Sequence, residues 1–80
     1  MLTILIENGV RLFFFENESN EPVHVHVDHQ GARAKFWVRP VRLAQNLGMS
    51  GATLAKAADI VSKHETFIWE KWHEFARKKS

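Results

Sequence analysis

Hydrophobic and polar residues alternate along the first half of the chain, and the alternation is strictest over residues 22–28. Successive side chains of an extended strand point to opposite faces, so this segment is predicted to be a strand with two different faces. One face carries the valines Val23, Val25 and Val27. The other carries His24, His26 and Asp28. The first face is expected to join the core, and the second to hold polar chemistry.

Two β-rich runs precede this strand, Leu2–Glu7 and Val10–Phe15, separated by Asn8-Gly9. That pair favours a two-residue type I′ turn, because both of its positions need positive φ. The resulting register places one apolar set on a single face: Leu2, Ile4, Ile6, Phe13 and Phe15. We expect this set to lie with the valines under a helix. The opposite face carries Thr3, Leu5, Leu12 and Phe14, which something such as a partner subunit is expected to cover.

Residues 16–22 form a polar, acidic connection, and the valine strand then runs into a second turn at Gln30-Gly31. A two-residue turn there predicts apolar cross-strand pairs on the core side: Val23 with Val38, Val25 with Phe36, and Val27 with Ala34. The same register predicts polar pairs on the other side: His24 with Trp37, His26 with Lys35, and Asp28 with Arg33. The same register pairs apolar residues on one face and polar residues on the other, which supports this register.

The second half of the chain changes to helical periodicity. Pro40 ends the fourth strand, Val41 and Leu43 allow a short fifth one, and Ser50 is a good N-cap. The following apolar positions recur every three or four residues: Leu54, Ala58, Val61, Ile68, Trp72 and Phe75. No proline or glycine interrupts residues 52–79, which favours one long helix, with a kink or split near residues 63–66. The prediction is an α+β fold, an antiparallel four- or five-stranded β-meander with the C-terminal helix packed on one face.

Composition narrows the class of protein. Eighty residues make one domain, residues 1–80, with a modest core, and the formal charge of +2 is too small to indicate nucleic-acid binding by itself. The absence of cysteine excludes disulfides, thiol nucleophiles and thiolate metal sites. No apolar run reaches the roughly 20 residues that span a bilayer. We therefore expect a cytoplasmic protein.

Several of these residues resemble a known family. The chain resembles the bacterial family called domain of unknown function 4160 in four segments. These are residues 20–27 (Asn-Glu-Pro-Val-His-Val-His-Val), the glycine turn after them, Ala34–Val38 and the helix ending in Trp72–Phe75. The signature strand of that family is Pro-Pro-His-hydrophobic-His-hydrophobic, and Val23 stands here in place of its second proline. The resemblance transfers His24, His26 and Trp72 as signature positions.

The resemblance implies a small cytoplasmic protein encoded beside a short partner of the family called domain of unknown function 2442. Such an arrangement is similar to a toxin–antitoxin pair, with this chain as the toxin-like member. The expected partner is that protein or a second copy of this chain, with nucleic acid as a further partner and no membrane.

Three hypotheses follow for the polar face. In the first, His24 and His26 act as catalytic general base and acid on a phosphate or RNA ligand, assisted by Arg33, Lys35, Trp37 and Asp28. Its alternative is an ordinary hydrated sheet face. In the second, the two histidines bind a metal with Asp28, His29 or Glu16; Lys35 and Arg33 oppose this, because fixed cations repel a divalent ion, and no metal or cofactor is assigned. In the third, the protein only binds a partner, through its apolar second face or the exposed edge of its sheet, with Leu5, Phe14 and Trp69 as the expected contacts.

Overall fold

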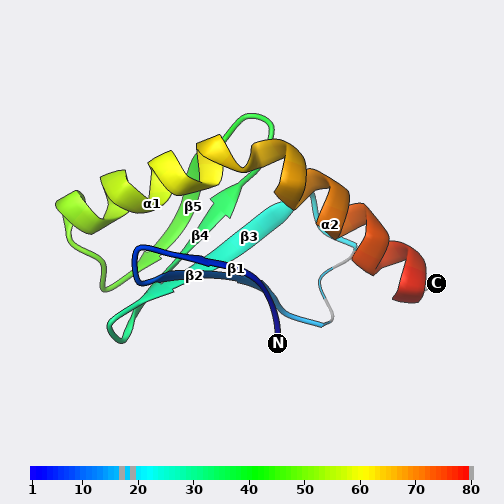
Figure 1. Ribbon diagram of the computed structural model, residues 1–80, viewed down its shortest axis with the longest axis horizontal. Coiled ribbons are helices and arrows are strands. Elements are labelled where there is room, and N and C mark those ends of the chain that lie inside the picture. Colours follow the sequence, from blue (N-terminus) through cyan, green and yellow to red (C-terminus); the bar gives the residue numbers. More distant parts are fainter. Residues whose placement is uncertain (17, 19, 80) are drawn as a thin grey trace.

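The computed structural model describes residues 1–16, 18 and 20–79. Five strands precede two helices: β1 (Leu2–Glu7), β2 (Val10–Phe14), β3 (His24–His29), β4 (Ala32–Trp37), β5 (Arg42–Leu47), α1 (Gly51–Lys63) and α2 (Glu65–Lys79). The strands form one antiparallel sheet in the order β1-β2-β3-β4-β5, and both helices lie on the same side of it (Figure 1). The predicted α+β meander is confirmed, with five strands rather than four.

Both predicted two-residue turns have the backbone that their sequences demand. Asn8 and Gly9 have φ of 51° and 77°, and Gln30 and Gly31 have φ of 49° and 85°. Two successive residues with positive φ are the signature of a type I′ turn, whose twist matches that of the flanking strands. The second turn sets the predicted register of β3 and β4, with His24 opposite Trp37, Val25 opposite Phe36, and so on to Asp28 opposite Arg33.

The helical half divides where the polar gap is. α1 begins after the N-cap Ser50, whose hydroxyl accepts a hydrogen bond from the Thr53 N–H at 3.2 Å, and it ends at Lys63. His64 lies between α1 and α2 with φ of −107° and ψ of 22°, outside helical geometry. The split near residues 63–66 is therefore confirmed. None of the described helices is long and apolar enough to cross a membrane.

The core lies between the helices and one face of the sheet. Its buried members are Val10, Leu12, Phe14, Val25, Val27, Ala34, Phe36, Val38, Met49, Ala57, Ile60, Val61, Ile68 and Trp72. Val25 and Val27 are fully buried, as the alternation in β3 predicts.

The predicted assignment of faces in β2 is wrong. Leu12 pairs with Val27 and Phe13 pairs with His26, so Leu12 and Phe14 face the helices and Phe13 lies on the histidine face. Phe14 is fully buried against the rings of Trp72 and Phe75 in α2. The chain's own helix, rather than a partner, covers this residue. Consecutive phenylalanines make both faces of β2 apolar, so alternation within the strand cannot distinguish them.

A bulge in β1 overturns a second part of the predicted hairpin. Thr3 pairs with Phe13 but Leu5 pairs with Leu12, so the register shifts at Ile4. Leu2 and Ile6 therefore lie on opposite faces of the sheet, although the alternation predicts one face for both. Leu2 lies with Phe14 on the helix side, whereas Ile6, opposite Arg11, is 65% exposed. An extra residue in one strand reverses the alternation beyond it.

Candidate functional site

The two histidines of β3 project from the same face of the sheet, as the sequence predicts, but they are not hydrated. His24 has no exposed surface and His26 is 7% exposed. Their rings lie 5.1 Å apart and are covered by aromatic side chains: Phe13 and Phe15 contact His26, and Trp37 and Trp72 contact His24. The interpretation of this end of the sheet face as a solvated surface is therefore wrong.

Packing of the helix on the valine face would leave the histidines facing away from it, but His24 contacts α2. The centroid of the Trp72 ring in α2 lies 4.8 Å from that of His24. Figure 1 shows the reason, since α2 passes over the point where β3 begins. Trp72 therefore contacts both the core and the histidine pair.

Glu18, from the acidic connection between β2 and β3, brings the two histidines together. Its Oε1 atom lies 3.0 Å from Nε2 of His24 and 2.8 Å from Nε2 of His26. One oxygen and two ring nitrogens, all within 4.8 Å of one another, form a group that can hold a metal ion. We call these three residues the histidine–glutamate cluster.

The hydrogen bonds of His24 constrain its tautomer. Its Nδ1 lies 2.9 Å from the carbonyl oxygen of Pro22, which can only accept, so Nδ1 carries the hydrogen and donates it. In a neutral ring Nε2 would then present a lone pair to the Glu18 carboxylate, which is also an acceptor. The contact at 3.0 Å therefore requires a hydrogen or a bound cation between the nitrogen and the oxygen.

The pKa directions of the other two members fit an ionised glutamate beside a neutral imidazole. Burial alone would raise the pKa of Glu18, but the hydrogen bonds from His24 and His26 outweigh it and hold that pKa below its ordinary value. Burial lowers the pKa of His26, and the hydrogen bond to Glu18 offsets this only in part. A carboxylate and neutral imidazoles are the forms in which these side chains ligate metals.

The other predicted site residues lie on the same face but bond to one another. Asp28 accepts from Arg33 Nε at 2.6 Å and from Arg11 Nη2 at 2.6 Å. Lys35 Nζ donates to Glu21 Oε1 at 2.9 Å and lies 4.6 Å from the centre of the Trp37 ring. The predicted Asp28–Arg33 pair is thus in contact, and Lys35 also contacts Trp37. Their charges are compensated in ion pairs, and the Lys35 ammonium also contributes to lowering the pKa of His26.

The alternative third ligands considered from the sequence have other partners. Asp28 is bound by two arginines, His29 Nδ1 lies 3.1 Å from the Gly9 carbonyl, and Glu16 pairs with the N-terminal amine. Glu18 takes that place, and sequence reasoning missed it. The available signal was the acidic connection immediately before the histidine strand. Only the folded conformation of that connection shows which of its carboxylates contacts the histidines.

The residues expected to form a partner interface are dispersed. Phe14 is in the core, and Leu5 is half-buried against it. Trp69 is also half-buried, with the Arg39 guanidinium 4.3 Å from its ring centre and the ring of His73 4.9 Å away at an angle of 45°. Leu5, Phe14 and Trp69 are thus largely occupied by contacts within the chain.

Comparison with known proteins identifies one match. The model of a family described as Domain of unknown function (DUF4160) matches residues 9–73, which include all of the cluster. No curated protein and no solved structure matches the chain.

Proposed function

The chain belongs to the family Domain of unknown function (DUF4160), and we propose from its site geometry that it binds one divalent transition-metal ion, of which Zn²⁺ fits best, through Glu18, His24 and His26. The observation that carries this proposal is the convergence of the three ligand atoms on one point, with the Nδ1–H of His24 already committed to the Pro22 carbonyl. Two imidazoles and one carboxylate are a common zinc ligand set, which a water molecule completes.

The distances support this assignment. Zinc bonds of about 2.0–2.2 Å in a tetrahedron separate neighbouring ligand atoms by roughly 3.4 Å. The Glu18 oxygen would therefore move from each Nε2 atom by about half an ångström to admit an ion, starting from 3.0 and 2.8 Å. A rotation of the Glu18 side chain provides this shift, and rotations of the imidazoles would bring the two Nε2 atoms, which lie within 4.8 Å of each other, to the same separation.

The surroundings of His24 supply a further argument. Metal-ligating histidines usually donate their other ring N–H to a carbonyl or carboxylate, which fixes the tautomer and the ring orientation. His24 has this arrangement with Pro22. A bound cation would also bridge its Nε2 atom and the Glu18 carboxylate, which otherwise face each other as two acceptors.

Repulsion from nearby cations was the main argument against a metal. Arg33 makes two hydrogen bonds to Asp28, and Lys35 is paired with Glu21. Each cation is thus paired with a carboxylate, which reduces its electrostatic cost to an ion.

A structural role for the ion fits the burial better than catalysis does. His24 is fully buried, so no substrate reaches it in this conformation. Glu18 comes from the β2–β3 connection and the histidines from β3, so the ion would fasten this connection onto the sheet. Acid–base catalysis by both histidines has no comparable geometric support.

Titration of chelator-treated protein with zinc chloride, followed by calorimetry, tests the proposal. We expect one ion per chain, and an affinity at least tenfold lower for Glu18→Gln, which keeps the shape of the side chain but removes its charge. Saturation at about 100 times Kd stabilises the fold by roughly 2.7 kcal/mol, which should raise Tm by more than about 10 °C.

The matched control is His73→Gln, an exposed histidine of α2 outside the cluster. It should bind zinc as the unaltered protein does. Absence of binding, or equal affinity in Glu18→Gln and the unaltered protein, would refute the metal site. Because Glu18 is partly exposed, its substitution should leave the fold intact, which circular dichroism checks.

The toxin-like role in a gene pair stays a proposal that rests on the family resemblance. Its test is inducible expression with and without the adjacent gene, with growth and RNA integrity as the readouts. Lack of an effect in both cases would remove it without bearing on zinc binding.

A further inference from the structure

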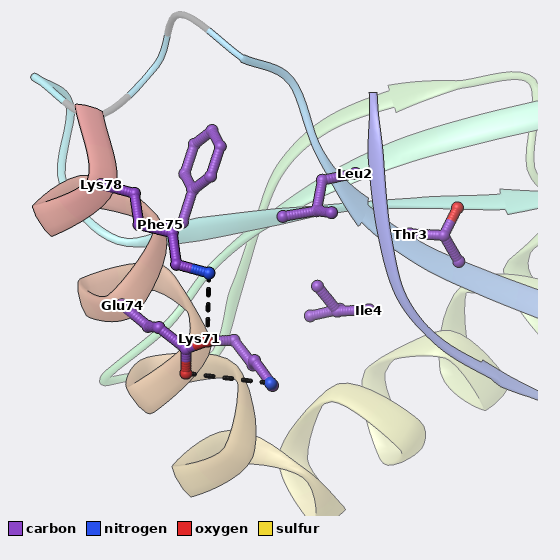
Figure 2. Close-up of a pocket in the computed structure, with 7 residues that line it drawn as sticks. All are labelled: Leu2, Thr3, Ile4, Lys71, Glu74, Phe75 and Lys78. Carbon is purple, nitrogen blue, oxygen red and sulfur yellow. Dashed lines mark ion pairs between the residues drawn. The ribbon is translucent and has the colours of Figure 1, made fainter.

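A hollow of about 220 Å³ lies between β1 and α2, far from the histidine–glutamate cluster in the sequence and formed by different residues. Its lining is Leu2, Thr3, Ile4, Lys71, Glu74, Phe75 and Lys78. Figure 2 shows Leu2 and Ile4 directed from β1 toward the helix, with the lysines and Glu74 on the opposite side. We call this hollow the β1–α2 groove.

The groove adjoins an unpaired strand edge. β1 is the first strand of the sheet and bonds to β2 on one side only. Within residues 1–16, 18 and 20–79, its other edge has no strand partner. Such an edge presents backbone N–H and C=O groups that can accept a further strand. A segment added there would lie beside Leu2 and Ile4, next to the groove.

The size of the groove indicates what it can hold. Pockets for drug-sized ligands have roughly 300–1,000 Å³, so this smaller hollow suits one or two side chains. Its apolar lining is partly open, since Leu2 is 42% exposed. A hydrophobic side chain from an added strand would cover Leu2, Ile4 and Phe75. The groove therefore suits a peptide better than a small molecule.

The charges at the groove favour an acidic occupant. Lys71 and Lys78 both approach the single carboxylate of Glu74, at 3.8 and 3.9 Å, which is longer than a hydrogen bond. One carboxylate therefore balances only one of two ammonium groups. Both lysines are well exposed, with 40% and 77% of their side chains accessible, so they can reorient toward a new carboxylate.

We propose that the β1–α2 groove binds an extended acidic segment of a partner protein, which adds to β1 as a sixth strand and inserts one hydrophobic side chain between β1 and α2. The backbone of β1 would provide affinity, the apolar lining would select a hydrophobic residue, and the lysines would select acidic neighbours. This inference goes beyond metal binding and does not depend on it.

The spacing of the lysines suggests a pattern for the segment. Lys71 and Lys78 are seven positions apart, which is about 10 Å along a helix. In a strand, residues on the same face recur every two positions, or roughly 7 Å, so acidic residues two positions on either side of a central hydrophobic residue are about 13 Å apart. Flexible lysine side chains cover the difference. The expected pattern is acidic-x-hydrophobic-x-acidic.

A nine-residue peptide with valine at its centre, aspartate two positions to either side and threonine elsewhere is a suitable probe. Titrated into ¹⁵N-labelled protein, it should shift the amide resonances of Leu2, Thr3 and Ile4 more than those of β5. A peptide with lysine in place of both aspartates should bind at least tenfold more weakly. Equal binding of the two peptides, no shifts at millimolar peptide, or shifts centred on β5 would overturn the proposal.

Variants of the protein test whether the peptide binds beside Lys71 and Lys78. The double variant Lys71→Glu and Lys78→Glu should weaken binding of the aspartate peptide at least tenfold and improve binding of the lysine peptide. The control Lys56→Glu changes an exposed lysine on α1 and should leave both affinities unchanged. If Lys56→Glu weakens binding as much as the double variant, the effect is one of net charge and the proposal fails.

A second copy of the chain is the competing occupant. It would produce a concentration-dependent dimer in sedimentation experiments without peptide, and the substitution Leu2→Asp would dissociate that dimer. We expect a monomer under these conditions. A dimer that uses this groove would contradict the peptide proposal.

Discussion

Trp72 of α2 and His24 of β3 are in direct contact, with ring centroids 4.8 Å apart and an angle of 58° between their planes. Trp72 also meets Phe14 edge to face at 5.4 Å. One side chain therefore joins the core to the histidine–glutamate cluster. Any change in the cluster that moves His24 should be transmitted to α2 through this contact.

Replacement of Trp72 by phenylalanine should lower the free energy of unfolding by about 1–3 kcal/mol, because a smaller ring leaves a cavity at a site that is only 3% exposed. Urea denaturation measures this loss. Trp37→Phe is the matched control, since Trp37 is half-buried on the opposite face of the sheet and should cost less than about 1 kcal/mol. A larger loss for Trp37→Phe than for Trp72→Phe would contradict the packing described here.

Replacement of Asp28 by asparagine should destabilise the fold by about 1–2 kcal/mol, since it removes charged hydrogen bonds to Arg11 and Arg33. The two guanidinium groups, which flank the ring of Phe13 at 4.7 and 4.9 Å, would then repel each other. Chemical denaturation measures the loss.

Asp59→Asn provides the control for this change, because Asp59 is exposed on α1 and its replacement should alter stability by less than about 0.5 kcal/mol. About 1 M sodium chloride shortens the screening length to roughly 3 Å, so the effect of Asp28→Asn should shrink there. An effect that is independent of salt would argue against repulsion between the arginines.

Glu7 should make the stability of the fold depend on pH. The hydrogen bond from Lys63, and then that from His64, hold the pKa of Glu7 below its ordinary value of 4.5. A carboxyl group with a depressed pKa in the folded state stabilises the fold above its unfolded pKa, and this contribution is lost as pH falls through the folded pKa.

The urea midpoint of the unaltered protein should therefore exceed that of Glu7→Gln at pH 6, and the difference should diminish as the pH is lowered from about 5 to 3. Both proteins are compared at each pH, so that the contributions of the other carboxyl groups to stability cancel. A difference that stays constant over this range would show that Glu7 contributes through shape rather than charge.

Local rules decided much of the architecture. The turns at Asn8-Gly9 and Gln30-Gly31 follow from the small set of residues that accept positive φ. The register of β3 and β4 was predictable because the alternation on both faces agrees with a two-residue turn. The division of the helices near His64 coincides with a gap in the apolar stripe.

The sequence by itself thus determined the strands, the turns and the projection of His24 and His26 from one face, because backbone sterics and side-chain alternation act over a few residues. Only the tertiary structure decided which face of β2 meets the helices, where β1 bulges, and that Glu18 closes over the histidines. These features depend on contacts between distant segments. Phe13 and Phe14 satisfy either face equally well, and the conformation of a polar connection is set by what it packs against.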